Sequence, residues 1–445
     1  MTYKRVVFLI LFPLCTIVGQ YIPEYYLEYK TRKTSFDIGK AWEGLSTIGD
    51  IRFVINDDFK TKRTVSKTFI SGGVQINAFE NQFLFSGFSY MKYDNNYFAY
   101  ISTPIKAFTS DKQNLSFDPF KAEEESSGFG YENNWLLLQF GKGNESWGSG
   151  DKIQLALNKK SSSYDYFLLR SDYGRIRVKY IHGFLETINN INRFITARAI
   201  EWTNKKSFII GFSETVIYSG ENRSIDIGYL NPISSHLEVE LNDRLNVIGN
   251  KNSNAVWQMH IDFLYKKKLR LSANYLLDEL VLDPDIQLNK ENGKAASLRV
   301  AYTPLSKNHL ITIYGYLIYV GTPTFRHGNG ENNFVKDGRP LGWSGGSDGL
   351  ELSFGINYFN KKNLFFSIST GFTVNGEESI TQRVFEPYKD YLKGPFPSGA
   401  VNNSFYFKAS SEYWLNKKYS LKALVQTSNN DFFINSIFSI PIIGF

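Results

Sequence analysis

The sequence is poor in the residue types that support thiol chemistry and helical membrane spans. Its 445 residues include 3 methionines and a single cysteine, Cys15. Cys15 lies in a segment that we expect to be removed as a signal peptide, so the mature chain is expected to hold no thiol. That excludes disulfides, cysteine-bound metals and cysteine nucleophiles. Beyond this segment no apolar run approaches the ~20 residues of a transmembrane helix, which excludes helical spans.

Concentrated positive charge and metal-binding spacings are also lacking. The 50 Lys and Arg residues exceed the 43 Asp and Glu residues by 7, but they are spread along the chain, so nucleic-acid binding has no support. The 5 histidines form no HExxH motif and no other metal spacing. The acids at 123–125, Asp283 and Asp285 are typical of exposed loops. We therefore expect no metal, no cofactor and no catalytic residue, and thus a protein that is not an enzyme.

The first residues predict secretion. Lys4 and Arg5 precede the apolar stretch 6–18, and cleavage after Gly19 would follow the pattern of a signal peptide. The alternative, a transmembrane anchor, is disfavoured because the stretch is too short to span a bilayer. We divide the chain into a signal peptide at 1–19, an irregular segment at 20–60 that is a candidate periplasmic plug, and a β-domain at 61–445.

Aromatic residues are abundant. Phe, Tyr and Trp make up 16% of the chain, with 37 Phe and 28 Tyr, and this excess favours strands over helices. Hydrophobic residues reach 42%, yet the mean hydropathy is only -0.28. A sheet with one face toward lipid and the other toward water gives this mixture.

Alternation with a period of two residues marks the strands. From Lys268 to Leu277 the odd positions are apolar, whereas all even positions up to Asn274 are polar or charged. The strands run for about ten residues, the length that a tilted strand needs to cross a bilayer. We expect 16 to 18 of them, although alternation alone would also fit a soluble sandwich.

The connections favour a barrel over a sandwich, because short and long links alternate. Short links are predicted at 203–206, 266–268, 305–308, 360–363 and 416–418, and long ones at 183–192, 219–254, 280–295, 321–348 and 375–402. Outer-membrane barrels have short periplasmic turns and long outer loops. We therefore predict an all-β fold, an antiparallel transmembrane up-and-down β-barrel in the outer membrane of a bacterium, in contact with its lipids.

The last strand agrees with this interpretation. It would run from a hairpin at 428–430 to Phe445, and it would end on the same side as the short turns. Outer-membrane barrels often end on an aromatic residue, which that class of protein presents to the barrel-insertion machinery. We expect Phe445 to have this role.

Several segments carry a family resemblance. They are Leu137–Gly150 with its Trp-Gly-Ser-Gly element, Arg193–Trp202, Ile209–Tyr218, Tyr229–Pro232, Gly338–Trp343 and Gly345–Asp348. Together and in this order they resemble the Wzi-type capsule assembly proteins. The resemblance implies an outer-membrane barrel that acts as a lectin and holds capsular or extracellular polysaccharide at the cell surface. The small-residue and Pro-rich stretch usual after the Trp-Gly-x-Gly element is missing here, because the chain continues directly into 151–157.

These segments supply candidate polysaccharide-binding residues. Sugar rings stack on flat aromatic side chains, and their hydroxyl and acidic groups need polar or cationic partners. The aromatic candidates are Trp147, Trp202, Tyr218 and Trp343, and the polar candidates are Arg193, Arg198, Glu201, Glu214 and Asp348. The alternative interpretation is a structural network of lumen charges and interfacial aromatics.

Alternation creates a conflict at two of the candidates. Arg198 shares a face with Ile200 and Trp202, and Glu214 shares a face with Phe212. A cation facing lipid at mid-bilayer costs about 2–4 kcal/mol, and an acid somewhat less. Either a bulge, expected at Gly211, re-aims these strands, or their ends rise above the membrane.

The opposite face is basic, which leaves a second function open. The inward cations are expected to be Arg175, Arg177, Lys179, Lys268, Arg270, Arg299, Lys408 and Lys422. A cationic lumen would favour an acidic polysaccharide or, in the alternative function, passage of anionic solutes or oligosaccharides through a channel. Ion pairing with loops folded into the barrel is the competing interpretation. A lipid hydrolase would need a Ser–His pair, and the sequence identifies none.

Overall fold

The computed structural model describes most of the β-domain. Its described residues are 64–77, 81–93, 96–107, 126–133, 135–159, 161–204, 207–236, 253–266, 268–278, 291–304, 309–360, 364–388, 394–414, 420–428 and 431–444. The expected signal peptide with Cys15, the candidate plug at 20–60 and the terminal Phe445 lie outside these ranges.

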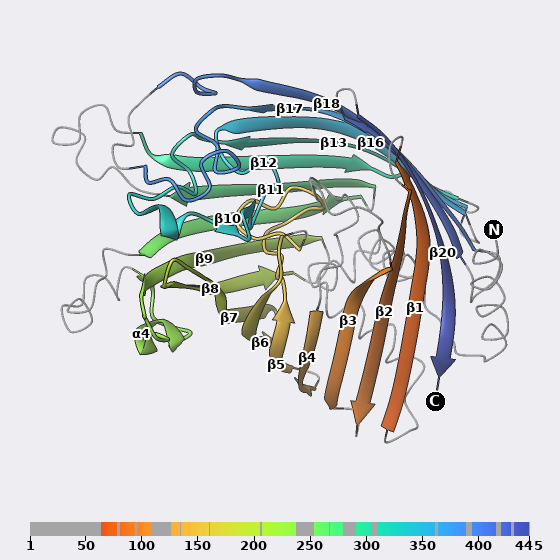
Figure 1. The fold of residues 1–445 in the computed structure, drawn as a ribbon, viewed down its shortest axis with the longest axis horizontal. Coiled ribbons are helices and arrows are strands. Elements are labelled where there is room, and N and C mark those ends of the chain that lie inside the picture. Colours follow the sequence, from red (N-terminus) through yellow and green to blue (C-terminus); the bar gives the residue numbers. More distant parts are fainter. Residues whose placement is uncertain are drawn as a thin grey trace.

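The described chain is built almost entirely of strands (Figure 1). They are β1 Thr64–Asn77, β2 Asn81–Tyr93, β3 Tyr97–Ala107, β4 Ser126–Glu132, β5 Leu136–Gly143, β6 Tyr164–Tyr173, β7 Ile176–Ile188, β8 Ile191–Thr203, β9 Phe208–Glu221, β10 Ser253–Tyr265, β11 Leu269–Asp278, β12 Gly293–Tyr302, β13 Leu310–Val320, β14 Val335–Lys336, β15 Arg339–Pro340, β16 Gly349–Phe359, β17 Leu364–Asn375, β18 Asn402–Trp414, β19 Ser420–Ser428 and β20 Asp431–Gly444. The helical pieces are the short α4 Ile227–Leu230 and the 3-10 turn η5 Gly330–Asn332. Among the residues that the structure describes, no helix has the length and apolar character needed to cross a membrane.

Eighteen strands form one antiparallel sheet, at the upper end of the expected number. Each strand pairs with the strands before and after it in sequence, with β14 and β15 set apart as a small hairpin between β13 and β16. The first and last strands also pair, from Lys67 opposite Gly444 to Asn77 opposite Phe433. The pairings therefore form a ring, and they confirm the predicted up-and-down barrel.

One face of the sheet carries a continuous apolar belt. Residues directly opposite each other on antiparallel strands share a face, and one such row crosses β10 to β18. It consists of Ile261, Ala273, Leu298, Leu317, Leu352, Phe372 and Phe405. All but Ala273 rank among the exposed large apolar residues. An exposed apolar row of this length is what a lipid-facing wall requires.

The other face is buried and mostly polar. The neighbouring row runs through His260, Asn274, Ser297, Ile318 and Glu351, which are successive partners on β10 to β16. All five are buried. The alternation predicted for Lys268 to Leu277 is confirmed, because Ser272 and Asn274 are buried whereas Tyr275 is 48% exposed.

The connections sort by length, with one correction. Short turns follow β6, β8, β10, β12, β16 and β18 and define the turn end of the barrel, while long links follow β5, β9, β11, β13 and β17 at the opposite loop end. The long link predicted at 183–192 is wrong, because β7 and β8 join through Asn189 and Asn190 alone. Both have positive φ, 50° and 66°, as the two-residue turn that suits the strand twist requires.

The apolar belt predicts a strong effect of a single charge. Met259 is 48% exposed and lies between its partners Phe212 and Tyr275. We expect Met259→Arg to lower the free energy of unfolding by about 2–4 kcal/mol, because a cation would face lipid. Urea unfolding in lipid vesicles measures the change. The control Met259→Leu should cost less than about 1.5 kcal/mol, and an equal loss in both variants would contradict the assignment of this face.

Candidate functional site

The chain between β5 and β6 folds back into the barrel and lies against the inner wall at the middle of β10 and β11 (Figure 1). The amide of Ser149 donates to Asn274 Oδ1 at 2.8 Å, and Asn274 Nδ2 donates to the carbonyls of Ser149 at 3.0 Å and Ile153 at 3.1 Å. Ser297 Oγ donates to the same Ile153 carbonyl at 2.7 Å. Two polar residues of the inner wall thus satisfy backbone groups of a segment that lacks regular structure.

The link between β13 and β16 packs on this inserted segment. Trp343 N donates to the carbonyl of Leu155 at 3.2 Å, and Trp343 Nε1 donates to Glu351 Oε2 on the wall at 2.6 Å. A Cβ at Gly342 would overlap the Leu155 carbonyl, so the close approach needs glycine there. Trp147, Leu155 and Trp343 belong to one buried core that lies between the loops and the wall.

Arg193, a residue of β8, holds another part of the link between β13 and β16 against the wall. Its guanidinium is fully buried and pairs with the Glu186 carboxylate. It also donates to three carbonyls, those of Glu331 at 2.5 Å, Asn333 at 2.7 Å and Val335 at 3.0 Å. The planar fork of arginine offers five donors, and here most of them bind backbone that would otherwise be buried without a partner.

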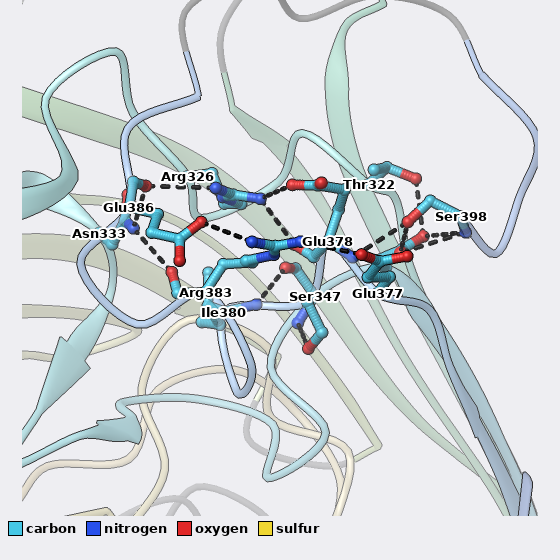
Figure 2. A network of polar contacts seen from close by, with 12 residues as sticks. Thr322, Arg326, Asn333, Ser347, Glu377, Glu378, Ile380, Arg383, Glu386 and Ser398 are labelled. Carbon is cyan, nitrogen blue, oxygen red and sulfur yellow. Dashed lines mark hydrogen bonds and ion pairs between the residues drawn. The ribbon is translucent and has the colours of Figure 1, made fainter. Parts of the chain in front are cut away.

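A third link, from β17 to β18, joins the link between β13 and β16 in a polar network (Figure 2). Arg326 pairs with the Glu378 carboxylate and donates to the Glu378 carbonyl at 2.9 Å. Asn333 Nδ2 donates to the Glu386 carbonyl at 3.2 Å. The buried carboxylate of Asp348 accepts from Thr322 Oγ1 at 2.7 Å and from the amide of Ser398 at 3.1 Å. The three links are therefore one interlocked body.

The surface of this body carries exposed charge. Arg383 is 31% exposed and lies between two carboxylates, Glu377 at 2.9 Å and Glu386 at 2.9 Å, which are 49% and 57% exposed. Hydrogen bonding to Glu386, and the charge of that residue, raise the pKa of Arg383. Guanidinium and carboxylate groups side by side can bind both the acidic and the hydroxyl groups of a sugar.

The inner wall is less basic in effect than the sequence indicates. Arg177 pairs with Asp172 at 2.6 Å. Lys179 Nζ lies 3.4 Å from Glu201 Oε1, and His260 Nε2 lies 3.3 Å from the same oxygen. Arg270 pairs with Asp262, and Arg299 stacks on Tyr314. Arg175 and Lys268 are exposed in turns, which corrects their assignment to the lumen. The acids that form these ion pairs with Arg177, Lys179 and Arg270 are on the wall.

Arg198 and Glu214 lie on the outward face, which settles the orientation that the sequence left open. They are direct partners, with Tyr180 and Trp257 beside them in the same row. The bulge expected at Gly211 is absent, since β9 keeps its register with both neighbours, and the irregularity lies in β7 between Phe184 and Glu186. The pair is little exposed all the same, at 12% and 3%, and His236 in the chain after β9 donates its amide to Glu214.

The nine candidate residues consequently fall into separate places. Trp147, Arg193, Trp343 and Asp348 hold the loop body together, and Glu201 lies on the inner wall. Arg198, Glu214 and Tyr218 share an outward cluster, while Trp202 is 40% exposed on the lipid face near the turn end. Their role as sugar contacts stays a prediction.

Sequence reasoning missed three residues that the loop body depends on. Asn274 and Glu351 were recognisable only as inward-facing polar positions, and Glu186 gave no signal because it fell in an expected loop. Within the described ranges, no three His, Cys, Asp or Glu side chains are grouped so that they could bind a metal ion.

Comparison with known proteins supports the fold. No protein-family model and no curated protein sequence matches the chain. Among solved structures, Wzi of Escherichia coli, an outer membrane protein involved in group 1 capsule assembly and a carbohydrate-binding β-barrel, matches with a TM-score of 0.58 at 10% identity, over 89% of this chain and 88% of Wzi. Pseudomonas aeruginosa OccK3 (OpdO) matches with a TM-score of 0.47 at 8% identity, over 86% and 96%. OprD of the same species matches with 0.45 at 8% identity, over 85% and 94%.

The fold is that of outer-membrane β-barrels, and the exposed apolar belt gives its physical reason. A ring of paired strands leaves no polar backbone toward lipid, and the belt matches the hydrocarbon layer. The protein therefore lies in the bacterial outer membrane.

The Arg193 contacts predict how the loop body is held. We expect Arg193→Met to destabilise it by about 3–5 kcal/mol, because three buried carbonyls would lose their donor and Glu186 would keep only the Asp337 amide and Lys336 at 4.0 Å. Amide hydrogen exchange at 331–335 should rise strongly while the strands stay protected. Arg383→Met removes only exposed ion pairs, worth up to about 1 kcal/mol, and serves as the control. Equal exchange in the two variants would show that Arg193 does not hold the loop.

Proposed function

We propose that this barrel binds a surface polysaccharide on its loop end and helps to anchor or assemble capsule or exopolysaccharide there, without catalysis. The loop end is expected to face outward, since the long loops of outer-membrane barrels are on the outside. A polymer that leaves the cell would meet this end first.

The observation that carries the proposal is the interlocked loop body. Three long links fold into or across the barrel; they are joined to one another through Trp343 and Asp348, and Arg193 joins them to the wall. Such a body turns the loop end into a rigid, polar surface, which suits a binding protein because little conformational entropy is lost on binding.

Two further points support a sugar ligand. The exposed group of Arg383, Glu377 and Glu386 offers a planar cation beside two acceptors. Wzi, which shares the fold at 10% identity, is a carbohydrate-binding β-barrel. The segments that resemble the Wzi-type family include Arg193, Trp343 and Asp348, which belong to the loop body described above.

The alternative, a channel for anionic solutes or oligosaccharides, was suggested by the basic inner face. Most of its buried cations have acidic partners on the wall, which weakens the attraction of a free anion. We expect no steady open conductance when the purified barrel is inserted in a planar lipid bilayer at neutral pH. A stable, anion-selective current would favour the channel.

The surface arginine provides a direct test of glycan binding. We expect Arg383→Met to weaken binding of an acidic capsular polysaccharide about 10- to 100-fold, from the ~1.5–3 kcal/mol of a hydrogen bond to a charged group. Binding of the purified barrel to immobilised polysaccharide measures the effect. The matched control is Arg175→Met, which removes an exposed arginine at the opposite end of the barrel.

Deletion of the protein in its native host tests the cellular role, with the same two variants used for complementation. Cell-associated polysaccharide should appear in the medium, and the Arg175→Met chain should restore retention better than the Arg383→Met chain. Unchanged retention after deletion, or equal binding by the two variants, would count against the proposal.

A further inference from the structure

The lipid-facing wall has a polar gap on four neighbouring strands. Below it, Val178, Ile200, Phe212 and Met259 form an apolar row on β7 to β10. The next row toward the loop end is Tyr180, Arg198, Glu214 and Trp257. The ion pair between Arg198 and Glu214 thus interrupts the apolar belt, because the residues of the row below it are all apolar.

The gap lies at the depth of the membrane. Glu214 lies six positions from Phe208, which is at the turn end of β9. Six residues extend about 20 Å along a strand. At a strand tilt near 40° this corresponds to about 15 Å along the membrane normal. The apolar band of such barrels is about 25 Å tall. Glu214 therefore lies near mid-height, and Tyr218, about 10 Å higher by the same geometry, lies near the outer edge of the band.

The chain that follows β9 closes the gap from outside the barrel. We call residues 222–236, which include α4, the clasp; Figure 1 shows α4 beside the ends of β7 to β9. The amide of His236 donates to both oxygens of Glu214, at 3.0 and 3.1 Å, and Tyr180 OH donates to the Tyr229 carbonyl at 2.8 Å. Tyr229 is fully buried and stacks on Tyr218 with ring centroids 4.7 Å apart.

The clasp also exposes aliphatic side chains, alongside the polar Ser224 and Asn231. Its exposed aliphatic residues are Ile225 at 52%, Ile227 at 81%, Leu230 at 42% and Ile233 at 88%. Exposed apolar side chains so close together mark an interaction surface. The clasp thus pairs with the polar wall through Tyr229 and His236 and leaves four aliphatic groups exposed.

We propose that the clasp is immersed in the outer leaflet of the outer membrane, where these four aliphatic residues contact lipid acyl chains. Continuity with the barrel belt supports this partner: Phe212 and Met259, which are 46% and 48% exposed, lie one row below the residues that the clasp covers. The clasp replaces the missing stretch of the belt with its own aliphatic groups, and the polar groups beneath it never meet lipid. This proposal rests on the fold alone and not on polysaccharide binding.

The test uses a fluorescent probe that reports its surroundings. In a Cys15→Ser background, single cysteines at Ile227 and Ile233 are labelled with an NBD fluorophore, and the barrel is reconstituted in phosphatidylcholine vesicles. Phe212→Cys serves as the lipid-facing reference. Asp337→Cys, at a loop position that is 59% exposed, serves as the aqueous reference.

We expect the probes at Ile227 and Ile233 to emit at the shorter wavelengths seen at Phe212. Doxyl-labelled phospholipid should quench them to about the same extent as the Phe212 probe. Iodide should quench them much less than it quenches the probe at Asp337. Iodide quenching equal to that at Asp337 would overturn the proposal. So would a blue-shifted emission that resists doxyl lipid and depends on the protein-to-lipid ratio, because a second copy of the chain would then cover the clasp.

Discussion

Satisfying backbone hydrogen bonds in a medium without water is the constraint on which the rest of this structure depends. Hydrocarbon offers no partner to an N–H or C=O group, so a sheet that spans the membrane needs a partner for every strand edge. Pairing of β20 with β1 meets this need, and it makes the sheet a ring with two unlike faces. Because side chains alternate between these faces, the row through Leu298, Leu317 and Leu352 must be apolar, while the row through Asn274 and Ser297 is free to be polar.

That freedom on the inner face is used to hold irregular chain. Loop segments inside a barrel bring backbone groups that strands do not satisfy, and polar wall side chains supply the partners. Asn274 does so for the segment after β5, and Arg193 does so for the link that follows β13. The inner wall thus acts as a scaffold for the loop end, and the exposed group around Arg383 is presented by loops that are joined to one another.

The outward cluster obeys the same rule from the other side. Arg198, Glu214 and Tyr180 would be costly next to lipid, and a bulge that turned them inward would have been one remedy. The chain instead keeps the register of β9 and lays the clasp over them, with the His236 amide on Glu214 and the Tyr229 carbonyl on Tyr180. An exception to the belt is therefore a place where a second layer of protein replaces lipid.

The sequence by itself determined the strands, their faces and the class of fold, because alternation, strand length and the order of short and long links are local properties. Alternation put Arg193 and Glu201 on the face opposite to Arg198, but it left open whether Arg198 and Glu214 point to lipid or to the lumen. The structure places Arg193 and Glu201 inside and Arg198 and Glu214 outside. It failed at 183–192, where two asparagines with positive φ make a tight turn. Only the tertiary structure decided what covers each face: alternation tells which way a side chain points, but the folding of the loops against Asn274, Arg193 and Glu214 depends on contacts between residues far apart in the chain.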